Sequence, residues 1–386
     1  MSYLYGFVIL IFTLMATNTY ITEKFIGLGP FLAEGIPLVI GQAIMFISWL
    51  FIAKKRLNST NLNFIILSLL FILFISTFQN IIFERNLSVY MFFFPFLPFF
   101  YLVYLINSDL SMYLKYEKLF DYFLYIYAIA SAGAALAGVL QILGIFQSIP
   151  FDGCCRVRGT MRNTLNLSTV CLLGIGAVHV SSKSRLTSYP LLIILFLGLL
   201  AAQSRGALLG AISIFAFFLF RTSKIKFFVL LPIIILSFIT VLIMLNTLFP
   251  VEFGFVSRFY DFSKTSGGDS DRLELYSSFF DNMSFFGAGI GTTGSGAGRF
   301  GDMIAFESYV LNIFYQIGIF SLPLIMIHFL AFYYGLYKGR IIDYLVGIHV
   351  CALFQQTFET PSLNTSVWMI LLASIIKNNL DDIKFN

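Results

Sequence analysis

Hydrophobic stretches recur from one end of the chain to the other, and polar segments separate them. Most of these stretches have the roughly 17–25 mainly apolar residues that a helix needs to cross a bilayer. The pattern predicts twelve membrane-spanning helices, at residues 3–19, 36–53, 63–83, 88–106, 122–144, 165–182, 188–202, 205–221, 225–249, 309–336, 341–358 and 362–377.

Some of these predictions rest on a weaker pattern. Segment 188–202 is short, and few residues separate 63–83 from 88–106. Segment 309–336 is too long for one straight span, so we expect its first part to be an amphipathic helix at the membrane interface. Segment 3–19 has no basic region before it and no small-residue cleavage site, which predicts a retained helix and not a cleaved signal peptide.

Composition agrees with a membrane protein. Of the 386 residues, 59% are hydrophobic and 11% are charged, whereas a soluble domain carries about 25% charged residues. The predicted fold class is therefore an all-α polytopic membrane protein, with residues 1–386 forming a single transmembrane domain. The long hydrophilic segment 250–308 is expected to be a partly helical loop within that domain.

The distribution of Lys and Arg predicts the orientation of the spans, because basic residues favour cytoplasmic loops. With the N-terminus inside, every inner connection carries at least two basic residues, and the long loop faces away from the cytoplasm. Fourteen of the 24 Lys and Arg residues then lie on the cytoplasmic side: Lys54, Lys55, Arg56, Lys115, Lys118, Lys183, Arg185, Arg221, Lys224, Lys226, Lys338, Arg340, Lys377 and Lys384.

Arginine predominates among the basic residues of the outer side, where only Lys24 and Lys264 are lysines. The planar guanidinium can bind a phosphate or carboxylate through two hydrogen bonds at once. This preference indicates a specific anionic ligand, and chance or a few structural salt bridges are the alternative. The outer arginines are Arg85, Arg156, Arg158, Arg162, Arg205, Arg258, Arg272 and Arg299.

The short outer loop 145–164 contains three of these arginines, Arg156, Arg158 and Arg162. A helical spacing between Arg158 and Arg162 would place their guanidinium groups on one face. Two like charges so close together imply an anion between them or water around them.

Arg205 lies where the seventh and eighth predicted spans meet. Gly206 and Gly210 follow it at a spacing that favours close helix packing, which would hold Arg205 in place. In the alternative interpretation, Arg205 extends to the outer interface only to keep its charge in water.

Loop 250–308 contains two features of interest. Residues 270–280 have apolar positions at helical spacing, with Ser270 as a plausible N-cap, and predict a short amphipathic helix. Glycines are dense from Gly287 to Gly301, and such a backbone can come close to a ligand. No strand precedes this region, so it matches neither a P-loop nor a dinucleotide fingerprint; a flexible linker is the alternative.

Glu307 lies where the chain returns to the membrane, and a carboxylate there is costly unless it is solvated, paired or used. It is a candidate general base, with Asp271, Asp281 and Asp302 as competitors and an exposed interfacial acid as the alternative. The four cysteines lack metal-site spacing, so we expect no metal and no cofactor. The histidines all fall within predicted spans: His179, His328 and His349.

Several short motifs follow one another between residues 160 and 330. They are Ala202-Gln203-Ser204-Arg205-Gly206-Ala207-Leu208-Leu209-Gly210, Arg272-x-x-x-Tyr276, Phe285-Phe286-Gly287-Ala288-Gly289-Ile290-Gly291, Glu307-Ser308-Tyr309-x-x-Asn312 and Gln316-Ile317-Gly318. Each motif is weak alone. Their order, spacing and common outer location resemble the O-antigen polymerase and ligase superfamily.

This resemblance implies a GT-C-like, metal-independent glycosyltransferase in the bacterial inner membrane, with both termini in the cytoplasm and the active site on the periplasmic side. The implied donor and acceptor are glycans linked to undecaprenyl pyrophosphate, the implied partners are membrane lipid and a chain-length regulator, and no nucleic acid is implied. Ligases of the superfamily carry a histidine near the end of the long loop. This chain has Glu307 in about that place, which favours a polymerase of Wzy type.

The resemblance and the outer arginines together suggest roles for individual residues. We expect Arg205 and Arg272 to stabilise the pyrophosphate leaving group and Glu307 to accept the proton of the acceptor hydroxyl. The residues expected to contact the substrate are Arg156, Arg158, Arg162, Arg299, Tyr276, Gly289 and Tyr309.

Three other function classes remain open. An O-antigen ligase differs from a polymerase only in its acceptor. A flippase or other secondary transporter would place ionisable groups near mid-membrane and often shows internal repeats, whereas here charges avoid the span centres. A membrane scaffold would not need arginines on several separate outer loops.

Overall fold

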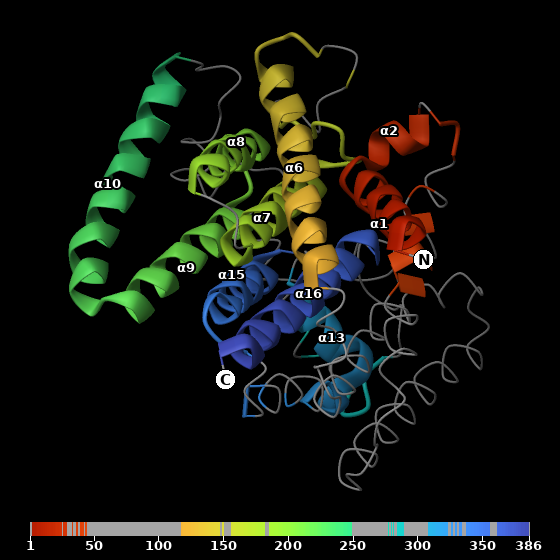
Figure 1. The fold of residues 1–386 in the computed structure, drawn as a ribbon. Coiled ribbons are helices and arrows are strands. Elements are labelled where there is room, and N and C mark those ends of the chain that lie inside the picture. The colour runs from red at the N-terminus through yellow and green to blue at the C-terminus, as the bar shows by residue number, and fades with distance from the viewer. Residues whose placement is uncertain are drawn as a thin grey trace, which may run out of the picture.

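The computed structural model is a bundle of helices, and no strand occurs in the part of the chain that it describes (Figure 1). The described residues are 2–24, 26–28, 117–146, 149, 156–181, 185–248, 277, 279, 281, 284–288, 308–322, 337–355 and 361–385, with single residues between 33 and 44 and between 326 and 333. The predicted helical fold is confirmed for these residues. Predicted spans 63–83 and 88–106 lie outside them, as do most of 36–53 and of loop 250–308.

The described part of the chain is helical almost throughout, and very short connections separate α8 from α9 and α9 from α10. Their bounds are α1 Ser2–Thr17, α2 Thr19–Lys24, α6 Glu117–Ile142, α7 Thr164–Val180, α8 Arg185–Ala202, α9 Arg205–Thr222, α10 Lys224–Leu248, α13 Tyr309–Ile317, the 3-10 turn η5 Gly318–Phe320, α15 Arg340–Phe354 and α16 Pro361–Phe385.

Two of the described helices are long and apolar enough to cross a membrane: α6 from Lys118 to Ile142, and α9. Shorter apolar stretches within α1, α7, α8 and α16 coincide with predicted spans. These helices give weak support for membrane association. They do not confirm twelve spans.

Two helix ends can be compared with the sequence prediction, and one agrees with it while the other does not. Helix α13 ends at Ile317, where Gly318 has a left-handed φ of 57°, so segment 309–336 is not one straight helix, as its length predicted. Helix α16 continues to Phe385, past the predicted end at residue 377. Hydropathy marks only the apolar part of a helix, and the end of α16 is polar.

Hydrogen bonds at two ends of the bundle fix the directions of three central helices. At one end, Gln355 at the C-terminus of α15 bonds to the first turns of α7 and to Ser204, which precedes α9. At the other end, Asp343 in the first turn of α15 bonds to His179 near the end of α7 and to Arg221 near the end of α9. Helices α7 and α9 therefore run parallel, and α15 runs antiparallel to both.

We call the end at which α7 and α9 begin the arginine end, and the opposite end the aspartate end. Helix α6 starts at the aspartate end, where Asp121 accepts a hydrogen bond of 2.9 Å from the Lys377 ammonium of α16. It finishes at the arginine end, where the Gln141 side chain meets the loop that precedes α7. The two ends take their names from Arg156, Arg158, Arg162 and Arg205, and from Asp121 and Asp343.

The predicted close packing at Gly210 is confirmed, and its partner is α15. A methyl group on Gly210 would lie 2.6 Å from the carbonyl oxygen of Gly347, and a methyl on Gly347 would lie equally close to the Gly210 carbonyl. A methyl on Gly206 would lie 3.1 Å from the Cβ of Gln355. Two glycine faces therefore let α9 and α15 approach closely along their length.

Candidate functional site

Arg205 is the first residue of α9 and follows a very short turn. Only Gln203 and Ser204 separate α8 from α9, and Gln203 has a left-handed φ of 53°. That conformation is uncommon for a residue other than glycine and often marks a functional position. Ser204 is the N-cap of α9, and its hydroxyl accepts a long, 3.5 Å hydrogen bond from the amide of Ala207.

The turn before Arg205 is fastened by a buried amide side chain. Gln355 is 3% exposed, and its Oε1 accepts a 2.6 Å hydrogen bond from the Ser204 hydroxyl. Its Nε2 lies within hydrogen-bonding distance of three oxygens of α7: the carbonyl of Leu165 at 3.1 Å and the hydroxyls of Ser168 at 3.0 Å and Thr169 at 3.2 Å. One side chain of α15 therefore joins the starts of α7 and α9.

The arginine-bearing loop before α7 folds onto the ends of α6 and α1. The amides of Arg158 and Gly159 donate to Oε1 of Gln141 at 3.2 and 3.1 Å. The hydroxyl of Thr160 donates to the carbonyl of Thr17 at 3.3 Å. The bond from Thr160 joins segments 143 residues apart in sequence, and together the three bonds hold the loop at the arginine end.

The prediction that Arg158 and Arg162 share a helical face is wrong. Gly159 between them has a left-handed φ of 53°, and α7 begins only after the N-cap Asn163, whose side chain accepts from the amide of Asn166. The helix therefore starts too late to include either arginine.

The two guanidinium groups of this loop have protein partners of their own. Arg158 donates through Nη1 to the carbonyl of Arg162 at 3.2 Å and lies over the ring of Tyr20, 4.6 Å from its centre. Nε of Arg162 is 3.9 Å from a carboxylate oxygen of Glu23. These contacts fasten the loop to α2, and each guanidinium has five N–H donors in all.

The structure thus places four of the predicted site residues at the same end of the bundle. Arg156, Arg158 and Arg162 precede α7, Arg205 begins α9, and Gln355 links the two helix starts. The positive ends of two helix dipoles face the same end of the bundle as the four arginines, an arrangement that favours an anion.

The other predicted site residues are placed differently or lie outside the described residues. Tyr309 opens α13, which packs against α15 and follows the N-cap Ser308. Of the competing acids, Asp281 is exposed. Those outside the described residues are Glu307, Arg272, Arg299, Tyr276, Gly289, Asp271 and Asp302.

Two of the short motifs meet in space. The amide of Ala288 donates to the carbonyl of Tyr315 at 2.8 Å, and the amide of Ile319 donates to the carbonyl of Phe285 at 3.1 Å. Gly287 and Gly318 both have left-handed φ, 78° and 57°. A methyl group on either glycine would overlap the backbone of the other segment. Residues 284–288 of the long loop are therefore docked onto the end of α13.

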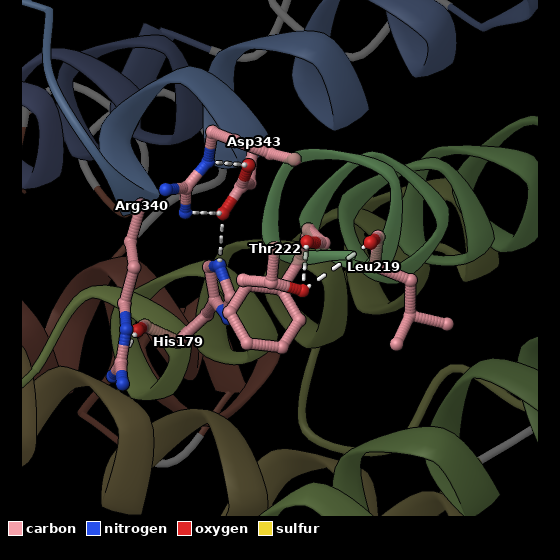
Figure 2. A network of polar contacts seen from close by, with 7 residues as sticks. His179, Leu219, Thr222, Arg340 and Asp343 are labelled. Atoms are coloured by element: carbon pink, nitrogen blue, oxygen red, sulfur yellow. Dashed lines mark hydrogen bonds and ion pairs between the residues drawn. The ribbon is translucent and has the colours of Figure 1, made fainter. Parts of the chain in front are cut away.

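The aspartate end contains a polar network that sequence reasoning missed (Figure 2). Asp343 is 0% exposed, and it accepts hydrogen bonds from Arg221 at 3.1 and 2.9 Å and contacts Nε2 of His179 at 2.8 Å. Arg340 donates to the His179 carbonyl at 3.0 Å. The sequence contains an acid, a histidine and an arginine near the ends of three predicted spans. Whether these residues meet depends on how the helices pair, which the sequence pattern does not specify.

The described residues contain no group of three or more His, Cys, Asp or Glu side chains that could hold a metal ion. A comparison of the chain with protein-family models gave no match, and a comparison with curated proteins likewise gave none.

Proposed function

We propose that the protein is a membrane glycosyltransferase that polymerises glycan repeat units carried on undecaprenyl pyrophosphate, with the arginine end facing away from the cytoplasm. The observation that carries the proposal is that Arg205 and the arginine-bearing loop lie at the same end of the bundle. There Gln355 bonds both to Ser204, which precedes Arg205, and to the start of α7, which follows the loop. The acids Asp121 and Asp343 lie at the opposite end. The arginine end has four arginines and Lys24 beside the carboxylate of Glu23, and this excess of positive charge suits a pyrophosphate.

The proposed reaction needs positive charge where the leaving group departs. The acceptor hydroxyl forms a bond to the anomeric carbon of the donor glycan, the bond from that carbon to the pyrophosphate oxygen breaks, and undecaprenyl pyrophosphate leaves with the electron pair. Arg205 and Arg272 stabilise the charge that develops on it. Glu307 accepts the proton of the hydroxyl as general base.

We propose different roles for the loop arginines and for Arg205. Because Arg158 and Arg162 contact Tyr20, Glu23 and each other, we assign them the role of holding the arginine-bearing loop in place beside the substrate. Arg205 is the main contact of the leaving group, since it begins a helix at a strained and fastened turn.

The proposal is tested in a strain that lacks the protein, by separating its surface polysaccharide on a gel. A polymerase loss leaves single capped repeats, a ligase loss leaves an uncapped core, and a flippase loss traps intermediates inside the cell. Single capped repeats support the proposal, and normal long chains contradict it.

Complementation with variants then tests the residues. We expect Glu307→Gln and Arg272→Lys to fail to restore long chains at normal protein levels. Full polymer length with Glu307→Gln would exclude it as the base, and full length with Arg272→Lys would remove it from the leaving-group site.

A further inference from the structure

We propose that Gln355 is a positioning residue that sets the place of Arg205 relative to the arginine-bearing loop, an inference that rests on the proposed function. Gln355 belongs to none of the motifs found in the sequence and lies 150 positions after Arg205. Its role follows from contacts that only the folded chain creates.

The geometry at Gln355 requires an amide. Its carbonyl oxygen accepts from the Ser204 hydroxyl, and its NH2 group donates to oxygens of α7. A carboxylate cannot donate, and an apolar side chain can do neither. Because the group is buried, loss of either half leaves polar atoms unsatisfied, which costs far more than a surface hydrogen bond.

A shift at Gln355 is transmitted to Arg205 with little loss. Ser204 is directly bonded to Gln355 and directly precedes Arg205. The backbone of Gly206 lies against the stem of Gln355, and Gln203 already has an uncommon left-handed φ. A displacement of the Gln355 side chain would therefore move Ser204 and, with it, Arg205.

The same amide also fixes the second group of arginines. Gln355 bonds to Leu165 and Ser168 in the first two turns of α7. Helix α7 begins directly after the N-cap Asn163 and Arg162. The start of α7 and the start of α9 are therefore held to one side chain, and the separation of the two arginine groups depends on it.

The test measures binding of undecaprenyl pyrophosphate to the full-length protein in detergent micelles, in a double-mutant cycle of Gln355→Leu and Arg205→Ala. Gln355→Leu keeps an extended side chain but removes the donor and the acceptor. We expect it to weaken binding about tenfold when Arg205 is present and to have a much smaller effect in the Arg205→Ala protein, where only the loop arginines remain to be displaced. A purely structural role would weaken both proteins equally.

Control variants keep the test valid if Gln355→Leu does not fold. Ser204→Ala removes the bond to Gln355 and should weaken binding, and Ser204→Thr restores a hydroxyl and should recover it. Tyr344→Phe removes another buried hydrogen bond of α15, from the phenol to the carbonyl of Val367 at 3.4 Å, and should leave binding unchanged.

The outcomes separate this inference from the proposed function. Unchanged binding in Arg205→Ala would overturn the proposed function itself. Weakened binding in Arg205→Ala, with no effect of Gln355→Leu and Ser204→Ala, would overturn only the positioning role. Equal losses from Gln355→Leu with and without Arg205 would also overturn it.

Discussion

The arginines of the arginine end differ in what they contact. Arg158 lies over Tyr20, and Arg162 faces Glu23, so part of their charge serves to hold the loop against α2. Arg205 begins a helix at a turn held by Gln355. The enrichment of arginine therefore reflects both local attachment of the loop and the proposed contact with an anion.

Asp343 is the residue on which the aspartate end depends. It is fully buried between Arg221 and His179. We expect Asp343→Asn to destabilise the protein by about 1–3 kcal/mol, because the buried position loses the charge-assisted hydrogen bonds to Arg221 and His179. The measurement is the midpoint of thermal unfolding in detergent.

The control for this prediction is Asp281→Asn, since Asp281 is exposed and its loss should change little. If both variants unfold at the same temperature as the unmodified protein, the network does not hold the three helices together.

At the scale of elements, the contact between Phe285–Ala288 and the end of α13 depends on two glycines. We expect Gly318→Ala to destabilise this contact by about 1–3 kcal/mol, because alanine disfavours the left-handed φ and its methyl group would overlap the Phe285 carbonyl. Faster protease cleavage in the long loop and a lower unfolding midpoint would report the change.

Gly27→Ala is the matched control for Gly318→Ala. Gly27 also has a left-handed φ, 75°, but an added methyl group would meet nothing within 4 Å. Gly27→Ala therefore has the same cost of a left-handed φ as Gly318→Ala, but its methyl group does not overlap another part of the chain. Equal effects of the two variants would show that the docked contact adds nothing.

Hydropathy predicted the positions of the described helices well, and their pairing not at all. The starts of α7, α9 and α15 fall within one residue of the predicted 165, 205 and 341. The pairing of α9 with α15 depends on Gly210 and Gly347, and no periodicity within one helix specifies a partner more than 100 residues away. For the same reason Arg205 was identified from its local motif, and Gln355 was missed.

At the scale of the whole molecule, the helix directions sort the polar groups into two ends. Lys24, Glu23 and the four arginines lie at the arginine end, and Lys377 and Arg340 lie at the aspartate end with Asp121 and Asp343. We propose that the arginine end is the outer one, as the Lys and Arg distribution predicted.

Labelling of single cysteines tests this orientation. In a protein whose four native cysteines are replaced, Lys24→Cys should react with a membrane-impermeant thiol reagent added to intact cells, and Lys224→Cys should react only after the membrane is opened. Both lysines lie in exposed positions, so access depends on the side of the membrane. The reverse pattern would contradict the orientation.

The central claim, that Arg205 serves glycan polymerisation, is tested most directly by chain extension in vitro with the purified protein and undecaprenyl-pyrophosphate-linked repeat units. The comparison is between Arg205→Lys and the matched Arg340→Lys at the aspartate end, both measured against the unmodified protein. We expect the unmodified protein and Arg340→Lys to form long chains, and Arg205→Lys to lose on the order of 10²–10³-fold in rate, because an ammonium cannot reproduce the planar fork on the leaving pyrophosphate. Absence of chain extension by the unmodified protein, or equal rates for the two variants, would contradict the account.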